Sequence, residues 1–72
     1  MKQRLKVREI AEARSLTMAK LQRAADINQR TMYAIYHDPY RDVAYSTLVK
    51  IANALGIEVT ELVEYVPDDR TD

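Results

Sequence analysis

The spacing of apolar residues between positions 17 and 37 constrains the fold more than any other feature of the chain. The apolar side chains follow one another at intervals of 4, 2, 5 and 3: Leu21, Ala25, Ile27, Met32 and Ile35. A single straight helix cannot hold these positions on one face. Two helices joined by a tight turn can, and the stretch therefore predicts a helix-turn-helix arrangement.

The flanking residues supply signals for the helix ends. Thr17 is a good N-cap for the first helix, which we expect to end near Asp26. Asn28 can cap the second helix, so that the turn lies between residues 26 and 28. The second helix should end at His37 or one residue later, because Pro39 disfavours helical geometry in the residue before it.

Three further helices are predicted outside this arrangement. The apolar period indicates one at about residues 3–14. Another should occupy residues 46–55 and be closed by Gly56, the only glycine in the chain and a good left-handed cap. Residues 58–66 offer a short final helix, although their β-branched side chains would also suit a strand. Residues 38–45 lose the helical period and should form a loop.

These elements predict an all-α fold, a compact bundle of five helices. One domain should span residues 1–66, and residues 67–72 should form a disordered acidic tail. No stretch approaches the roughly 20 apolar residues needed to cross a bilayer, and no apolar segment follows the N-terminal positive charges. We therefore expect a soluble protein without a membrane span.

The composition argues against an enzyme. Without cysteine, the chain cannot form disulfides, use a thiol nucleophile or bind zinc through thiolates. His37 is the only histidine, so no histidine pair can bind a metal, and a single glycine leaves no glycine-rich phosphate loop. We predict no catalytic residues, no metal site and no cofactor.

A formal net charge of zero hides an uneven distribution of charge. Residues 1–42 carry nine Lys or Arg against five acids, whereas residues 43–72 carry two against six. A molecule with this polarity can turn a basic face to an anion while its acidic end points away.

The second helix of the arrangement has an unusual outward face. With Met32 toward the core, the opposite face at 100° per residue contains no acid. Asn, Gln and Arg read base edges in the DNA major groove, whereas an ordinary solvated helix face would show Glu and Lys. Residues 28–38 are therefore predicted to be a recognition helix.

The segment from about Val7 to Val66 resembles the Cro and phage-repressor type of helix-turn-helix transcriptional regulators. LTMAKLQRAADINQRTMYAIY is similar to the bihelical motif of that family, and STLVKIANALGIEVTELVEY is similar to the segment that follows it. The resemblance implies a five-helix DNA-binding domain whose third helix enters the major groove.

The resemblance also implies which residues contact DNA. Base contacts are implied for Asn28, Gln29, Arg30, Tyr33, Ala34 and His37. Phosphate contacts are implied for Thr17, Met18, Thr31, Arg41, Tyr45, Ser46 and Thr47. Three positions depart from the family pattern: Met18 where Gln is common, Gln22 where a small residue is usual, and Asp26 where the turn usually has glycine.

The predicted function is sequence-specific binding of double-stranded DNA by a transcriptional repressor in a bacterial or phage-type cytoplasm. A homodimer would double the base contacts, and residues 57–66 would form it through Ile57, Val59, Leu62 and Val66. The same residues could instead close the monomer core. Two alternatives stay open: an antitoxin or adaptor whose C-terminal part binds a protein partner, and a protein-interaction module that has lost DNA binding.

Overall fold

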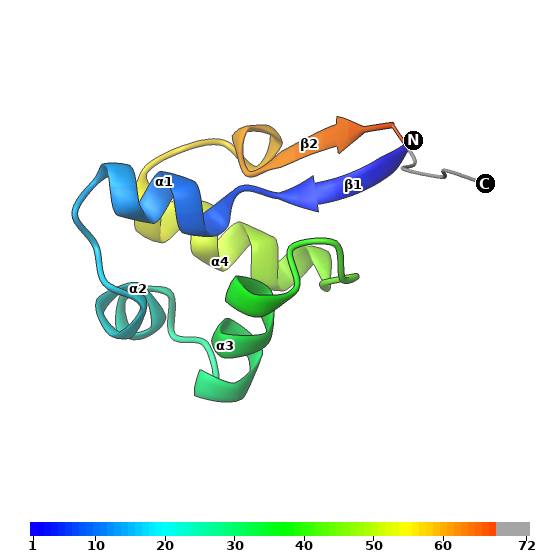
Figure 1. Cartoon of the computed structure of the whole chain (residues 1–72). Helices are drawn as coiled ribbons and strands as arrows, with labels where there is room; N and C mark the ends of the chain where they lie inside the picture. The colour runs from blue at the N-terminus through cyan, green and yellow to red at the C-terminus, as the bar shows by residue number, and fades with distance from the viewer. Residues whose placement is uncertain (68–72) are drawn as a thin grey trace.

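Four α-helices, a short 3-10 turn and a two-stranded sheet make up residues 1–67, the part of the chain that the computed structural model describes (Figure 1). In chain order the elements are β1 (Lys2–Leu5), α1 (Val7–Ala13), α2 (Met18–Ala25), α3 (Gln29–His37), α4 (Tyr45–Leu55), η1 (Val59–Glu61) and β2 (Val63–Val66). Beyond Pro67, the predicted acidic tail lies outside the described residues. No helix within residues 1–67 has the length and apolarity needed to cross a membrane.

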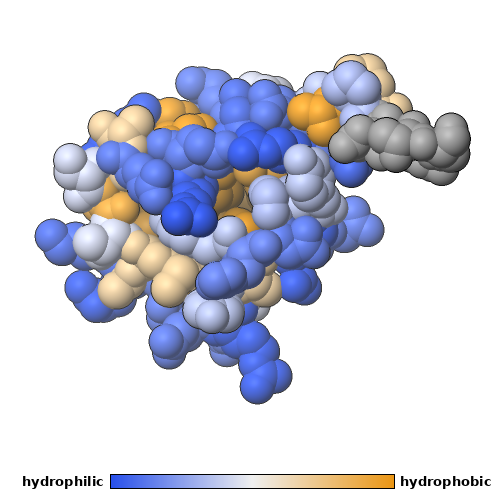
Figure 2. Space-filling view, viewed as in Figure 1, coloured by the Kyte–Doolittle hydropathy of each residue, from blue (hydrophilic) through white to orange (hydrophobic). Residues whose placement is uncertain are grey.

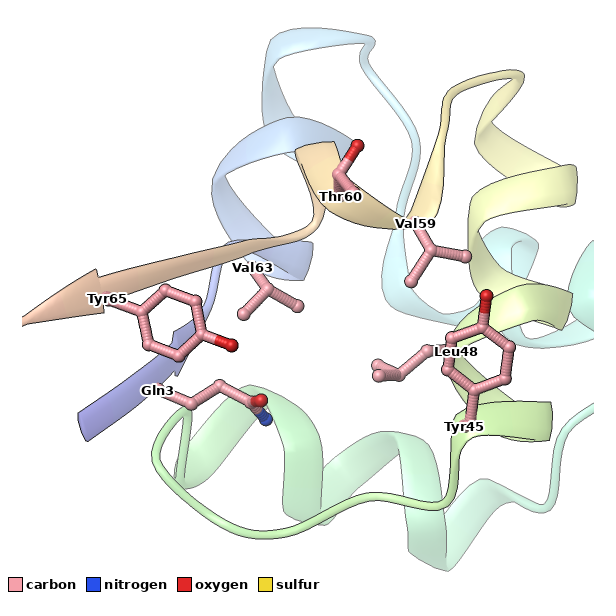
Figure 3. Close-up of a pocket in the computed structure, with 7 residues that line it drawn as sticks. All are labelled: Gln3, Tyr45, Leu48, Val59, Thr60, Val63 and Tyr65. Carbon is pink, nitrogen blue, oxygen red and sulfur yellow. The ribbon is translucent and has the colours of Figure 1, made fainter. Parts of the chain in front are cut away.

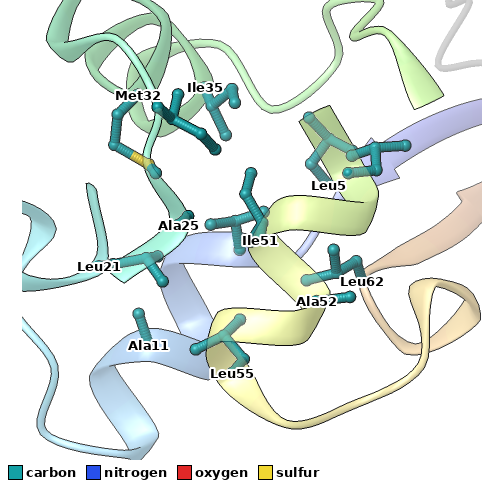
Figure 4. Packing of buried hydrophobic residues seen from close by; sticks show 13 residues of the cluster. Leu5, Ala11, Leu21, Ala25, Met32, Ile35, Ile51, Ala52, Leu55 and Leu62 are labelled. Atoms are coloured by element: carbon teal, nitrogen blue, oxygen red, sulfur yellow. The ribbon is translucent and has the colours of Figure 1, made fainter. Parts of the chain in front are cut away.

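Helix α4 lies at the centre of the core. It buries four side chains along one face, and α1, α2 and η1 pack against it. Figure 4 shows buried side chains converging on it from the other helices, from β1 and from the segment before β2. The buried set is Leu5, Val7, Ala11, Leu21, Ala25, Ile27, Met32, Ile35, Leu48, Ile51, Ala52, Leu55 and Leu62. Each of these is apolar, so burial of hydrocarbon surface is the main term that stabilises the fold.

The sheet joins the two ends of the described chain. Strands β1 and β2 pair antiparallel, from Lys2 opposite Val66 to Leu5 opposite Val63. The pairing continues one residue further, where the Lys6 N–H donates to the carbonyl of Leu62 at 2.7 Å. The strands are therefore held by their backbones as well as by packing.

The predicted helix over residues 58–66 is wrong. Only Val59–Glu61 forms a turn of 3-10 helix, and Val63–Val66 is a strand. The turn starts with a capping box, in which the Glu58 N–H donates to the Glu61 carboxylate at 3.1 Å. It then stops because the β-branched residues that follow gain a full ladder with β1, which a helix of this length could not match.

The first predicted helix begins later than expected. Residues 3–14 were expected to be helical, but α1 starts at Val7 and Lys2–Leu5 is extended. Leu5 is buried from the strand, where it pairs with Val63, whereas Val7 already belongs to α1, so the apolar residues assigned to one helix are divided between two elements. The all-α bundle of five helices is therefore corrected to four α-helices and a two-stranded sheet.

The helix over residues 46–55 is confirmed, starting one residue earlier. Gly56 closes it in the left-handed conformation with φ of 73°. The Ile57 N–H then donates back to the carbonyl of Ala52 at 3.0 Å. Helix α1 ends in the same way, with Ser15 at φ of 58° and the Leu16 N–H donating to Ala11 at 2.9 Å. Both ends are Schellman caps, which satisfy carbonyls that the helix would otherwise leave unpaired.

Leu62 offers a direct test of this core. Its side chain is 0% exposed, while its backbone carbonyl accepts the bond from Lys6. Leu62→Ala keeps the backbone bond and removes the packing, so we expect the free energy of unfolding in urea to fall by about 2–5 kcal/mol. Thr60→Ala, an exposed change on the neighbouring turn, should stay within about 0.5 kcal/mol. Equal stability of the two variants would contradict this role of Leu62.

Candidate nucleic-acid interface

The turn between α2 and α3 fixes the angle between the two helices. Asp26 adopts the left-handed conformation with φ of 57° and ψ of 54°. Its N–H donates to the carbonyl of Arg23 at 3.2 Å, and the Ile27 N–H donates to Gln22 at 3.1 Å. Ile27 is buried and fills the corner between the helices. The predicted helix-turn-helix arrangement is confirmed, with a third Schellman cap at its bend.

Side-chain caps start both helices, as predicted. The Thr17 hydroxyl accepts a bond from the Lys20 N–H at 3.2 Å. The Asn28 Oδ1 accepts from the Arg30 N–H at 2.7 Å. This bond uses only the oxygen of the Asn28 amide, so its two N–H groups stay available to a partner.

Helix α3 turns a polar face away from the core. Met32 and Ile35 are buried; five of the six residues with implied base contacts lie on the rest of the helix, and the sixth, Asn28, caps it. Ala34 is half-buried. The other five are exposed: Asn28, Gln29, Arg30, Tyr33 and His37. Figure 2 shows hydrophilic side chains along the lower edge of the molecule, where α2 and α3 lie in Figure 1. As the helical period predicts, Met32 and Ile35 therefore point into the core and the polar side chains of α3 point outward.

Two aromatic rings on this face contact each other. The ring centroids of Tyr33 and His37 lie 4.1 Å apart with an interplanar angle of 37°. Their spacing of one helical turn places the rings side by side. The contact restricts both side chains before any ligand arrives.

Tyr36, on the same helix, belongs to the core edge. Its side chain packs against the buried cluster, and its hydroxyl is buried without a hydrogen-bond partner among the described residues. Burial raises the pKa of this hydroxyl, and the nearby Glu12 carboxylate adds to the rise. Tyr36 therefore packs on the core side of α3 and does not face outward with Tyr33.

The residues with implied phosphate contacts come from α2, α3, α4 and the loop before α4. Thr17 and Met18 start α2, and Thr31 lies half-buried in the first turn of α3. Arg41 is exposed in the loop before α4. The remaining three form the first turn of α4: Tyr45, Ser46 and Thr47. No side chain caps α4; the Thr47 N–H donates to the carbonyl of Ala44 at 3.0 Å, and no side chain accepts from the N–H groups of Tyr45 and Ser46.

Strand β1 holds the loop that carries Arg41, which the sequence did not predict. The Leu5 N–H donates to the carbonyl of Pro39 at 2.7 Å. The Lys2 ammonium lies 4.4 Å from the centre of the Tyr40 ring, in cation–π geometry. No local pattern in the sequence indicates these contacts, because they join the N-terminal strand to a loop far along the chain.

The cations divide into two groups. Arg4 pairs with Glu9 and, at 2.9 Å, with Glu64, while Arg8 pairs with Glu12 at 3.1 Å. None of the ion pairs within residues 1–67 includes the four cations of α2, α3 and the following loop: Lys20, Arg23, Arg30 and Arg41. These four are also exposed, so the positive charge around α3 is open to an anion.

The pKa values of Arg4 and Glu9 reflect their pairing. Hydrogen bonds from Arg4 to Glu9 and Glu64 raise the pKa of the Arg4 guanidinium. At Glu9, partial burial acts to raise the pKa, but the bond from Arg4 and further favourable contacts outweigh it and lower the pKa. Arg4 therefore serves the fold by joining α1 to β2, and it is not part of the open positive charge.

Comparison with known proteins identifies one family. A family model described as Cro/C1-type HTH DNA-binding domain matches residues 6–68. The match includes α1 to α4, η1 and β2, with the helix-turn-helix at its middle. A search of the curated proteins found no match to the chain.

Asp26 allows the strain at the turn to be measured. A side chain in the left-handed conformation costs roughly 1 kcal/mol that glycine does not pay. We expect Asp26→Gly to raise the free energy of urea unfolding by up to about 1 kcal/mol, and Asp26→Ala to lower it. Asparagine also tolerates the left-handed conformation but carries no charge, so Asp26→Asn separates the effect of backbone strain from the effect of the carboxylate charge. A less stable glycine variant would show that the Asp26 carboxylate holds the turn.

Proposed function

Because the chain belongs to the Cro/C1-type HTH DNA-binding domain family, we propose that it is a sequence-specific regulator that reads double-stranded DNA with α3 in the major groove. The observation that carries this proposal is the combination on α3 of an acid-free polar face with unpaired positive charge around it. A polyanion is the partner that such a surface attracts.

The residues of α3 suit different features of the bases. Arg30 can donate two bonds to guanine, and Asn28 or Gln29 can bond adenine. Ala34 is small enough to let the helix approach and to contact a thymine methyl. Tyr33 and His37 present a joined aromatic surface one turn further along. Together they give a helix of nine residues several distinct contacts along the groove.

Phosphate contacts would hold α3 in register. Arg41 and the start of α4 follow α3 in the chain, Thr17 and Met18 precede it, and Thr31 lies in its first turn. Backbone N–H groups at Tyr45 and Ser46 would donate to phosphate oxygens. These contacts carry no sequence information, so they position the helix while the α3 side chains discriminate.

We also infer that the protein represses and acts as a dimer in the cytoplasm of a bacterial or phage-type system. A regulator that is bound at an operator keeps other proteins from binding the same DNA, and it needs no contact with those proteins to do so. One recognition helix reads few bases, whereas two copies on half-sites about 34 Å apart double the readout.

Arg30 gives the sharpest test of this function. A bound sequence is first selected from a random DNA pool, and affinity is then measured by fluorescence anisotropy across salt concentrations. The logarithm of affinity should fall with the logarithm of salt, with a slope of about 0.9 per neutralised phosphate. Arg30→Ala should lose about 1–3 kcal/mol of discrimination at one base pair while unfolding stays unchanged.

Arg30→Lys is the matched control. It keeps the charge but loses the two-pronged donor, so discrimination should fall while the salt slope stays near that of the parent protein. Absence of binding to any selected duplex at low salt would overturn the proposal. Unchanged base preference in both variants would remove Arg30 from the reading surface.

A further inference from the structure

The loop between α3 and α4, residues 38–44, carries Arg41 at an exposed position. Within this loop the Tyr40 N–H donates to the Asp38 carboxylate at 3.2 Å. The Arg41 N–H donates to the Asp38 carbonyl, also at 3.2 Å. These two bonds shape a turn at the end of α3, and contacts from β1 then fix that turn to the rest of the fold.

Strand β1 contacts the two loop residues that come directly before Arg41. The Leu5 N–H donates to the Pro39 carbonyl at 2.7 Å, and the Lys2 ammonium lies 4.4 Å from the centre of the Tyr40 ring. In Figure 1 the loop lies below β1, in agreement with these contacts. A backbone bond and a side-chain contact on consecutive residues restrict the turn more than either would alone.

Arg4 fixes the strand from which these contacts come. It pairs with Glu9 of α1 and, at 2.9 Å, with Glu64 of β2. Alternate residues of a strand face the same side, so Lys2 and Arg4 lie on one face of β1. Lys2 therefore reaches the Tyr40 ring from a strand that is held by two other elements.

The contact between Lys2 and Tyr40 uses the face of the ring. A cation is attracted by the negative face of an aromatic ring, more strongly where water is partly excluded, and Lys2 is half-buried. None of the ion pairs within residues 1–67 includes Lys2, so no carboxylate competes with the ring for it. The phenol hydroxyl has no part in this attraction, and phenylalanine would serve equally well.

We propose that Lys2 and Tyr40 are positioning residues for DNA binding, because their contact holds the turn in which Arg41 meets a phosphate. The inference rests on the proposed function, in which Arg41 makes a phosphate contact. A loop that is ordered before binding loses less conformational entropy when the complex forms. The family match begins at residue 6, so β1 precedes it, and the match does not assign this role.

Tyr40→Leu and Tyr40→Phe form the matched pair for the test, because neither changes the net charge. Tyr40 is 46% exposed, so both changes leave the buried core intact. The duplex selected from the random pool is titrated by fluorescence anisotropy. Tyr40→Phe should bind it like the parent chain, whereas Tyr40→Leu should raise the dissociation constant about two- to fivefold. Base preference should stay that of the parent in both, since a phosphate contact carries no sequence information and a displaced α3 would alter it.

Arg41→Ala tests whether the ring acts through Arg41. This change should weaken binding and lower the salt slope by about 0.9, the value for one phosphate. Adding Tyr40→Leu to Arg41→Ala should cause no further loss, because the ring then has no cation to position. Lys2→Arg keeps a cation over the ring and should bind like the parent, while Lys2→Ala should weaken binding as Tyr40→Leu does.

A measurement without DNA follows the position of the loop itself. In the free protein, the NMR order parameter of the Arg41 amide should fall in Tyr40→Leu and stay near that of the parent in Tyr40→Phe. The amide of Arg23 on α2 serves as the internal control and should not change. An unchanged order parameter at Arg41 in Tyr40→Leu would overturn the inference.

The outcomes separate this inference from the proposed function. A parent chain that binds no selected duplex would overturn the function, and the inference with it. If the parent chain binds and Tyr40→Leu binds equally well, the inference alone is overturned. An equal loss in Tyr40→Leu and Tyr40→Phe would show that the hydroxyl contacts DNA directly. An undiminished effect of Tyr40→Leu in the Arg41→Ala background would show that the ring acts independently of Arg41, and either result also overturns the inference.

Discussion

Strand β1 has a hydrogen-bonded partner on each edge, and the arrangement of the remaining elements depends on that pairing. One edge binds β2, more than fifty residues later in the chain, and the other binds the carbonyl of Pro39 in the loop after α3. Antiparallel geometry makes this possible, because alternate peptide groups of a strand point in opposite directions. The position of the loop that carries Arg41 is therefore set by the first residues of the chain, as well as by the helices on either side of it.

The sequence predicted the helices better than the sheet for a physical reason. A helix repeats its apolar signal every turn and ends at capping residues such as Thr17, Asn28 and Gly56, so local information suffices. A strand of four residues offers only two inward positions, and here its partner lies at the other end of the described chain. Leu5 and Val63 looked compatible with helices until their pairing placed them on one sheet face.

The same distinction separates the two surfaces of the molecule. The outward face of α3 could be predicted, because Met32 and Ile35 fix the rotation of one helix. The apolar pocket between the sheet and the start of α4 could not be predicted, since it brings Gln3 and Tyr65 opposite Tyr45, and no local pattern links these residues (Figure 3). The division of the cations into paired and unpaired groups also needed the fold, as Arg4 meets Glu64 only across the sheet.

The Schellman cap at Asp26 has a consequence for the thermodynamics of recognition. Two backbone hydrogen bonds fix the turn to the end of α2, and the buried Ile27 fills the corner between α2 and α3, so the arrangement is formed without a ligand. A protein whose recognition element is already ordered loses little conformational entropy on binding. Its association with a ligand should therefore show a small change in heat capacity, set by the surface covered rather than by coupled folding.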